Sequence, residues 1–210
     1  MEFNNLGFQL DFVILDTEYT TWEGALERMW NGPNEERELV QISAIRVSNF
    51  LTLNNTKFFS VYTKPQINPV LSDYFIKLTG IEQNVLENNG ISIQKGIEQF
   101  SAFSKDAFCL CWGDDVIVLE NNLELIKSEI KLRFSRSADI RKLFENYGID
   151  TSKFNSGTIN EFSSIASIIK PGKSHNALSD SISILSSLTK LEKMYGEDEL
   201  KKSLYNLPNF

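Results

Sequence analysis

The apolar run Phe12-Val13-Ile14-Leu15 leads directly into two carboxylates, Asp16 and Glu18. A short apolar run of this kind is typical of a strand that is buried on both faces of a sheet. Residues two apart on a strand share a face, so both carboxylates project from the same side. Two like charges repel there, and a cation between them explains their proximity better than a purely structural role does. Because ligand sites of α/β proteins lie at the carboxyl ends of sheet strands, this one feature constrains the fold and the site together.

The rest of the chain alternates between strand patterns and helix patterns. β-Rich stretches at 39–47 and 57–62 predict neighbouring antiparallel strands, and 108–112 predicts a second buried strand. The polar stretch from Thr20 to Arg37 is expected to be an ordered loop or a short helix. Apolar spacing and capping residues predict helical segments at 72–78, 92–103, about 116–130, 139–147, 158–169 and from about 174 onward. Without an internal repeat or a dividing linker, the pattern predicts a single α/β domain over residues 1–210.

A third acidic element, Asp114-Asp115, follows the second predicted buried strand. Acidic residues are favoured in the first turn of a helix because they interact with the positive end of the helix dipole. A carboxylate at this position would also converge on Asp16 and Glu18, since the ends of parallel strands share one edge of a sheet. From the residues alone, both explanations stay open.

The chain has one histidine, His175, in the sequence His175-Asn176-Ala177-Leu178-Ser179-Asp180. Ser174 or Asn176 can cap the helix that follows, which places Asp180 in its first turn. Imidazole is the side chain whose ordinary pKa lies closest to neutral pH. A lone histidine is more often a structural residue, but the neighbouring acidic residues favour a proton acceptor beside a metal site.

The composition limits the kind of nucleic-acid binding that the chain could perform. Its net charge is −7, from 21 basic and 28 acidic residues. Proteins that coat long stretches of DNA or RNA usually have a basic surface, because neutralising phosphates dominates their affinity. A nucleic-acid-binding protein of this composition is therefore expected to grip a short end, with metal ions offsetting the phosphate charge.

The cysteines and the amino terminus bear on location. Cys109 and Cys111 lie in an apolar stretch and are expected on one buried face of a strand, and one histidine cannot complete a zinc site with them. The start Met1-Glu2-Phe3-Asn4-Asn5 lacks the parts of a signal peptide, and no apolar run approaches the ~18 residues of a membrane span. We therefore expect a cytoplasmic protein with reduced thiols and no membrane partner.

Taken in order, these motifs resemble those of the DEDDh 3′–5′ exonuclease superfamily, which includes ribonuclease T and polymerase proofreading exonucleases. The matching motifs are Asp16-x-Glu18, Leu78-Thr79-Gly80-Ile81 preceded by Lys64-Pro65, Asp115, and His175-x-Ala177-x-x-Asp180. Together they cover roughly residues 10 to 190. The stretch from Asp16 to Gly24 is also similar to a stand-alone bacterial branch of ribonuclease T-type exonucleases.

The resemblance implies a ribonuclease H-like α/β fold, with a mixed five-stranded sheet flanked by helices. It also implies two divalent cations, Mg²⁺ or Mn²⁺, and an oxygen-rich ligand set suits such hard cations. The implied roles are that Asp16, Glu18 and Asp180 hold the first ion, Asp16 bridges to the second, Asp115 acts through its waters, and His175 takes the proton of the attacking water. The residues expected near the terminal nucleotide are Tyr19, Thr20, Leu78, Thr79 and Ile81.

The chain departs from the family pattern at two points. In relatives the middle aspartate often stands three residues after a glycine, whereas Asp115 stands two after Gly113. Leu119, four residues after Asp115, matches a leucine of the family and favours Asp115 over Asp114. The chain also shows no counterpart to the basic patches of ribonuclease T.

Two hypotheses of different class follow. The first is a 3′–5′ exonuclease that hydrolyses single-stranded nucleic acid to nucleoside monophosphates, with RNA or short oligonucleotides slightly favoured over DNA. The second is a non-catalytic regulatory or interaction protein on the same fold. A decayed site would have lost at least one of its five motif residues, and the presence of all five favours the enzyme. A homodimer is compatible with the sequence, which carries no signal for or against it.

Overall fold

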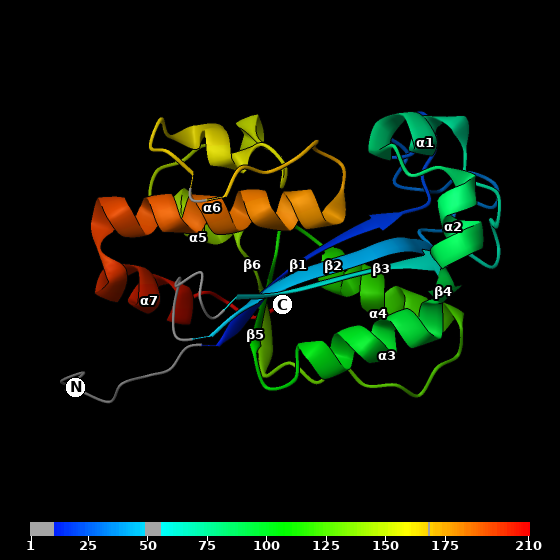
Figure 1. Cartoon of the computed structure of the whole chain (residues 1–210), viewed down its shortest axis with the longest axis horizontal. Coiled ribbons are helices and arrows are strands. Elements are labelled where there is room, and N and C mark those ends of the chain that lie inside the picture. Colours follow the sequence, from blue (N-terminus) through cyan, green and yellow to red (C-terminus); the bar gives the residue numbers. More distant parts are fainter. Residues whose placement is uncertain (1–10, 49–55, 168) are drawn as a thin grey trace.

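A mixed six-stranded sheet with the order β4-β3-β2-β1-β5-β6 forms the centre of the molecule (Figure 1). The structure, a computed structural model, describes residues 11–48, 56–167 and 169–210. The strands are β1 (Phe12–Tyr19), β2 (Leu39–Val47), β3 (Thr56–Lys64), β4 (Ile91–Ser92), β5 (Phe108–Cys111) and β6 (Arg136–Asp139). The expected mixed sheet corresponds to β3-β2-β1-β5-β6, and the two-residue β4 adds a sixth strand at one edge.

Helices cover both faces of this sheet (Figure 1). They are α1 (Asp73–Thr79), α2 (Gln83–Asn89), α3 (Ile93–Phe103), α4 (Asp115–Leu125), α5 (Arg141–Asn146), α6 (Ala177–Tyr195) and α7 (Glu197–Tyr205), with 3₁₀ turns at Thr151–Lys153 and Ile159–Phe162. On one face Phe12 and Ile14 of β1 share a core cluster with Leu188 of α6. On the other face Val13 and Leu15 share a second cluster with residues of α3 and α4. The α/β architecture expected from the sequence is therefore confirmed.

The alternation along β1 continues beyond its apolar residues. Asp16 and Glu18 lie on the same face of the strand as Ile14, and they face α6. Thr17 lies on the same face as Leu15, and it faces α4. Strand β1 pairs antiparallel with β2 along its whole length, but its parallel pairing with β5 ends at Leu15 and Cys111. The last residues of β1 thus project past the end of β5, and this leaves room for side chains from the helices.

Most of the predicted elements are confirmed, but two helix boundaries were wrong. The helix expected at 116–130 ends at Leu125, because Lys127 adopts a left-handed backbone with φ 52°. Residues 136–139 form β6, so the helix expected from 139 begins at Arg141. The stretch Thr20–Arg37 contains turns and no helix, which matches the loop alternative.

The largest correction concerns the helix expected at 158–169. Within the described residues, only Ile159–Phe162 is helical there, as a 3₁₀ turn. The carbonyl groups of Asn160 and Ser163 accept hydrogen bonds from Lys190 of α6, and the Ser163 side chain accepts one from the Ile165 amide. These partners replace the bonds that a continuous helix would make.

The expectations on the cysteines, membrane spans and the amino terminus have different outcomes. Cys109 and Cys111 are both buried and unpaired on β5, as expected, and burial raises the pKa of both thiols. Among the described residues, no helix combines the length and apolar character that crossing a bilayer requires. The signal-peptide argument concerned Met1–Asn5, which lie outside the described residues.

Candidate active site

Three buried carboxylates converge between β1 and the first turn of α6. Asp16, Glu18 and Asp180 each offer an oxygen, and these oxygens all lie within 4.8 Å of one another. The start of α6 is fixed by the Asn176 side chain, which caps the amide of Ser179. Three acidic side chains held so close in a buried place are a candidate cation site, because a bound cation would relieve their mutual repulsion.

The electrostatic cost of this cluster appears in its pKa values. Burial raises the pKa of Asp16 well above its ordinary value, and the charges of Asp115, Asp180 and Glu18 raise it further. Burial and the charges of Asp180 and Asp115 likewise raise the pKa of Glu18. Burial raises the pKa of Asp180 to about 6. The metal-free site therefore favours partial protonation near neutral pH, and a bound cation would favour the ionised carboxylates.

Asp115 lies buried beside the group, whereas the adjacent Asp114 is paired with Arg37. Asp115 is buried at the start of α4, and its Oδ1 accepts hydrogen bonds from the amide and the hydroxyl of Thr17, at 3.0 and 2.6 Å. Burial raises the pKa of Asp115 to about 7. The Asp114 side chain is half exposed and forms an ion pair with Arg37 at 2.5 Å. This geometry favours Asp115 as the middle carboxylate of the site.

His175 lies at the edge of the same cavity, immediately before α6. Its backbone is left-handed, with φ 61°, and its amide donates a hydrogen bond to Asp180 Oδ2 at 3.3 Å. The side chain is half-buried, and burial together with the nearby charge of Lys173 lowers the pKa of the imidazole. A neutral imidazole beside a carboxylate cluster is suited to accept a proton.

Ser156 is a site residue that the motifs did not indicate. Its hydroxyl donates a hydrogen bond to Asp180 Oδ2 at 3.0 Å, and a hydrogen bond from Ser156 also partly offsets the raised pKa of Asp16. The next residue, Gly157, approaches Asp180 so closely that a Cβ there would lie 2.7 Å from Oδ1. That Oδ1 is buried and has no hydrogen-bond partner among the described residues, which leaves it available to a cation.

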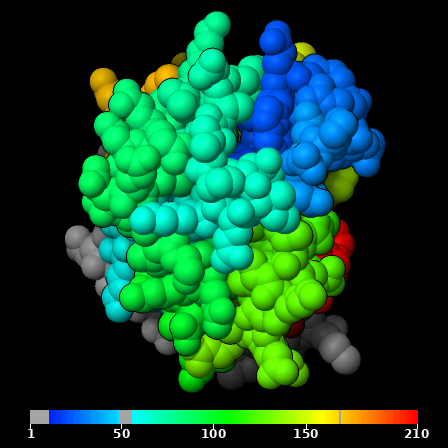
Figure 2. All heavy atoms as spheres, turned by 90° about the vertical axis from the view of Figure 1, so that its right-hand side faces the viewer, coloured from blue at the N-terminus to red at the C-terminus, as the bar shows by residue number. Residues whose placement is uncertain are grey.

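A cavity of about 410 Å³ opens over these carboxylates. Its lining comprises Asp16, Thr17, Glu18, Tyr19, Thr21, Trp22, Leu26, Trp30, Tyr74, Leu78, Trp112, Asp114, Asp115, Ser156, His175 and Asp180. In Figure 2 a hollow separates the blue spheres of the segment around residues 20–37 from the teal spheres of α1. The sequence motifs located the acidic floor of this cavity but not its aromatic walls.

The residues expected near a terminal nucleotide divide into two groups. Tyr19 and Leu78 line the cavity. Thr20 is buried and donates its hydroxyl to the Glu36 carbonyl, while Thr79 donates to the Phe75 carbonyl. Ile81 is 3% exposed and packs in a separate core cluster. Thr20, Thr79 and Ile81 thus hold the walls in position and do not line the cavity themselves.

Comparisons with known proteins place these features in context. The exonuclease family model RNase_T matches residues 13–186. Among curated proteins, ERI1 exoribonuclease 2 from Xenopus laevis is 28% identical over 94 residues, which is 43% of this chain and 12% of that protein. The chain therefore spans about an eighth of the length of this relative.

Solved structures share the fold along most of the chain. The nuclease domain of 3′hExo, a DEDDh family member bound to rAMP, superposes with a TM-score of 0.74 and 21% identity over 97% of both chains. Cell-death related nuclease 4 (CRN-4) gives a TM-score of 0.68 and 18% identity, over 88% of this chain and 64% of that one. E. coli exonuclease I in complex with a dT13 oligonucleotide gives 0.64 and 15%, over 94% of this chain and 44% of that one. At these identities the likeness shows the fold alone.

Proposed function

This chain belongs to the RNase_T exonuclease family, and from that membership we propose that it is a 3′–5′ exonuclease. The substrate in this proposal is single-stranded nucleic acid, and the products are nucleoside monophosphates. The observation that carries the proposal is the convergence of Asp16, Glu18 and Asp180 within 4.8 Å in a cavity that His175 also lines. We also propose that residues 1–210 form one exonuclease domain.

The residues present fit two divalent cations, Mg²⁺ or Mn²⁺. Their donors are carboxylate oxygens, the ligands that such ions prefer, and one of them, Asp180 Oδ1, is buried without a partner. Asp16, Glu18 and Asp180 would hold one ion, Asp16 would be shared with the second, and Asp115 would act through water. When bound, such a pair activates a water molecule and stabilises the leaving oxygen of an in-line displacement.

The protein residues supply the remaining functions. The neutral imidazole of His175 accepts the proton of the attacking water. Ser156 and Thr17 orient the carboxylates through hydrogen bonds, to Asp180 and Asp115 respectively. Tyr19 and Leu78, which line the cavity, would contact the terminal nucleotide.

RNA or short oligonucleotides remain slightly favoured over DNA. The curated relative is named an exoribonuclease, and the nuclease domain of 3′hExo was solved with rAMP. Exonuclease I, in contrast, was solved with a DNA oligonucleotide. Discrimination between the two depends on contacts to the 2′-hydroxyl.

Degradation of 5′-labelled single-stranded RNA and DNA in Mn²⁺, with and without EDTA, tests the proposal. We expect stepwise shortening from the 3′ end, inhibition by EDTA, and protection of a strand that ends in a 3′-phosphate. Activity in EDTA, or equal cleavage of the 3′-phosphorylated strand, would contradict it. Tight Mn²⁺ binding without any cleavage would support the non-catalytic alternative instead.

A further inference from the structure

A buried carboxylate outside the cavity, that of Glu38, holds an irregular segment of the chain by its backbone. Glu38 is 0% exposed and directly precedes β2. Its Oε1 accepts hydrogen bonds from the amides of Gln66 and Ile67, at 2.6 and 2.8 Å. Its Oε2 accepts one from the Asn68 amide at 2.6 Å and one from the Asn68 side chain at 3.3 Å. One carboxylate thus fixes three consecutive residues.

The chemistry of a carboxylate suits this task. Burying a charge is costly unless hydrogen bonds replace its hydration, and the amides of 66–68 provide those bonds. An ionised carboxylate only accepts hydrogen bonds, whereas the side-chain amide of glutamine also carries two N–H donors. A cluster of backbone donors therefore matches Glu38 better than it would match a neutral residue of the same shape.

The segment that Glu38 holds leads into one wall of the cavity. Residues 66–72 connect β3 to α1, and Tyr74 and Leu78 of α1 line the cavity. Ser72, which caps α1, donates its hydroxyl to the carbonyl of Thr21 on the opposite side. The position of this segment therefore determines where the α1 wall stands relative to the rest of the cavity.

The backbone of Glu38 is bonded to the end of β1, the strand that carries Asp16 and Glu18. The Thr20 amide donates a hydrogen bond to the Glu38 carbonyl at 2.9 Å. The Glu38 amide in turn donates one to the Thr20 hydroxyl, also at 2.9 Å. A single residue thus joins the carboxylate strand, through its backbone, to the α1 wall, through its side chain.

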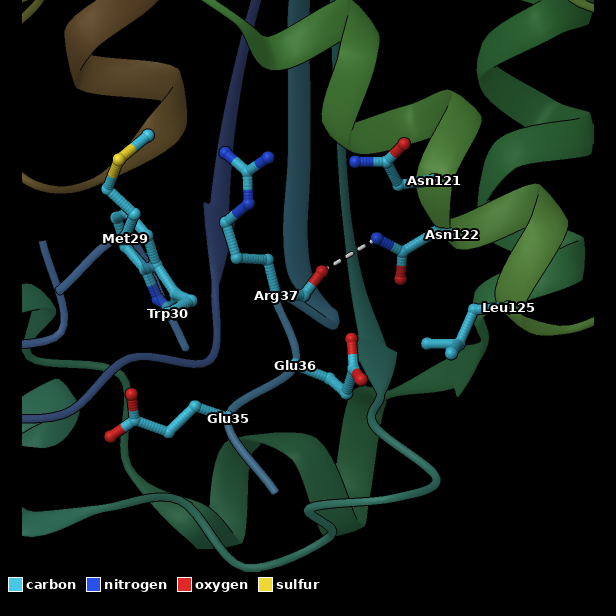
Figure 3. A pocket seen from close by; sticks show the side chains of 8 residues that line it. All are labelled: Met29, Trp30, Glu35, Glu36, Arg37, Asn121, Asn122 and Leu125. Carbon is cyan, nitrogen blue, oxygen red and sulfur yellow. Dashed lines mark hydrogen bonds between the residues drawn. The ribbon is translucent and has the colours of Figure 1, made fainter. Parts of the chain in front are cut away.

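Asn122 of α4 holds the chain on both sides of Glu38. Its side-chain oxygen accepts a hydrogen bond from the Leu39 amide at 3.0 Å, and its nitrogen donates one to the Arg37 carbonyl at 2.7 Å. Figure 3 marks the second bond with a dashed line, beside a hollow of about 190 Å³ that both residues line. Because α4 begins at Asp115, the Glu38 backbone is also fixed relative to the fourth carboxylate.

Apolar packing also holds α1, but it acts in a different way. Phe75 of α1 packs in a core cluster with Val40 and Leu71. Apolar burial is non-directional, so it favours contact without selecting one orientation. Hydrogen bonds weaken steeply when their geometry changes, so the four bonds to Glu38 specify where the segment lies.

We propose that Glu38 is a positioning residue, which sets the placement of the α1 wall relative to the carboxylates and thereby the fit of the terminal nucleotide. This inference rests on the proposed function, which places that nucleotide between the two. Glu38 does not line the cavity, so it acts only through the segment that it holds. Its substitution should weaken substrate binding and leave the chemical step intact.

Glu38→Gln tests the inference, because it places an amide nitrogen against backbone N–H donors. Kd for a 5′-fluorescein-labelled single strand, measured by anisotropy in Ca²⁺, should rise by about 10-fold, since groups about 1 Å out of place cost up to about 100-fold. In Mn²⁺, kcat should stay within about threefold, and calorimetry should show unchanged Mn²⁺ affinity. Amides of 71–79 should exchange with solvent about 10- to 150-fold faster, the scale of one lost hydrogen bond to a charged group.

Arg136→Gln is the matched control. Arg136 is also a charged side chain that fixes a chain segment, since it donates hydrogen bonds to the carbonyls of Leu204, Tyr205 and Leu207. It is paired with Phe108, at the end of β5 that lies away from the cavity. Arg136→Gln should lower the free energy of unfolding, as Glu38→Gln does, but leave Kd unchanged.

Asn68→Ala is a milder variant for the case in which Glu38→Gln does not fold. It removes one side-chain bond to Glu38 and another to the Asn34 carbonyl, so Kd should rise by about 2- to 10-fold. Unchanged Kd in a folded Glu38→Gln protein would overturn the inference, as would an equal rise in Arg136→Gln. If Glu38→Gln does not fold, unchanged Kd in Asn68→Ala would overturn it.

The outcomes also separate this inference from the proposed function. If the wild-type protein binds strands but does not cleave them in Mn²⁺, the proposed function fails, and weakened binding by Glu38→Gln still supports the role of Glu38. If the wild-type protein neither binds nor cleaves, amide exchange decides. Faster exchange of 71–79 in Glu38→Gln, but not in Arg136→Gln, would support the positioning of α1 by Glu38, and unchanged exchange would overturn it.

Discussion

Thr17 donates two hydrogen bonds to the same oxygen of Asp115, one from its amide and one from its hydroxyl. The amide is available because β5 ends level with Leu15, so Thr17 has no strand partner on that side among the described strands. The Asp115 side chain at the start of α4 accepts a hydrogen bond from this amide in place of a strand partner. The fourth carboxylate of the site is thus positioned by the difference in length between two adjacent strands.

Substitution of the two adjacent aspartates should have unequal effects. Asp115→Asn should lower kcat by about 100-fold or more, because it removes charge that would support a bound cation. Asp114→Asn breaks a partly exposed ion pair with Arg37 and should stay within about fivefold of wild type. Steady-state kinetics in saturating Mn²⁺ measure both, and the reverse order of effects would reassign the middle carboxylate to Asp114.

His175→Ala should lower kcat by about 10²–10⁴, the usual scale for a positioned base. Because the pKa of His175 is lowered, the wild-type rate should rise with pH below about 6.5 and then level off. The variant should lack this limb, while its affinity for Mn²⁺ stays nearly unchanged. Lys173→Ala should shift the limb to higher pH, since the Lys173 charge lowers the pKa of His175. If the His175→Ala protein kept the wild-type pH profile, His175 would have a structural role and would not be the proton acceptor.

The metal-free protein should lose stability as pH rises from 5 to 8. Asp180 and Asp115 have pKa values raised to about 6 and about 7 in the folded state, so the folded state binds more protons than the unfolded state over this range. Their stabilising protons are lost as pH passes through 6 and 7. The lowered pKa of His175 acts in the opposite direction, but it is a single group. We expect Tm in EDTA to fall by at least about 5 °C, since 1 kcal/mol shifts Tm by about 2–4 °C at this size.

Two comparisons check that this pH dependence arises at the site. Asp16→Asn removes one of the repelling charges, so its metal-free Tm should equal or exceed that of wild type and vary less with pH. Excess Mn²⁺ should raise the Tm of wild type through binding to the folded state, and raise that of the variant much less. A clear drop in the metal-free Tm of Asp16→Asn would mean that Asp16 has a structural partner.

Ser156→Ala should weaken Mn²⁺ binding by about 10-fold, because it removes the hydrogen bond that orients Asp180. Calorimetric titration of Mn²⁺ measures this without reference to activity. Ser152→Ala is a suitable control, since the Ser152 hydroxyl bonds to the exposed Asp150 in the same loop region. Unchanged Mn²⁺ affinity in Ser156→Ala would show that Asp180 is oriented by its helix alone.

Ile81→Ala and Leu78→Ala should separate packing from binding within one short motif. Ile81 is buried in a core cluster with Phe75 and Leu86, so its truncation should destabilise the protein by about 2–5 kcal/mol. Leu78 lines the cavity and is only partly buried, so Leu78→Ala should weaken oligonucleotide binding with a smaller loss of stability. Urea unfolding and anisotropy titrations measure the two effects. Weakened oligonucleotide binding by a fully folded Ile81→Ala protein would show that Ile81 contacts the terminal nucleotide, as the motif predicted.

The acidic floor of the site could be predicted from the sequence because it follows strand periodicity. Once Phe12–Leu15 is recognised as a buried strand, Asp16 and Glu18 must share a face, and Asp180 is fixed by a helix with a clear capping residue. Local rules of this kind do not depend on distant parts of the chain.

The walls of the site and the segment near 160 could not be predicted in the same way. The position of Ser156 depends on a loop that Lys190 holds by bonding to the Asn160 and Ser163 carbonyls, about thirty residues away. The short β6 was also missed because Arg136-Ser137-Ala138-Asp139 is mostly polar, and it forms a strand only by pairing with β5. Such contacts are tertiary and leave no periodic trace in the sequence.

The division of the site between β1 and the irregular stretch before α6 bears on hydrogen exchange. Backbone amides at Val13 to Leu15 lie in a strand paired on both sides, so they should exchange with solvent only when the sheet as a whole opens. His175 follows a stretch without regular structure in its described residues, and such stretches open locally at lower free energy. Amides preceding His175 should therefore exchange orders of magnitude faster than those of β1. His175 would leave its position and return many times while Asp16 and Glu18 stay in place. The bound metal would therefore persist for longer than any single interval in which His175 is positioned to accept a proton.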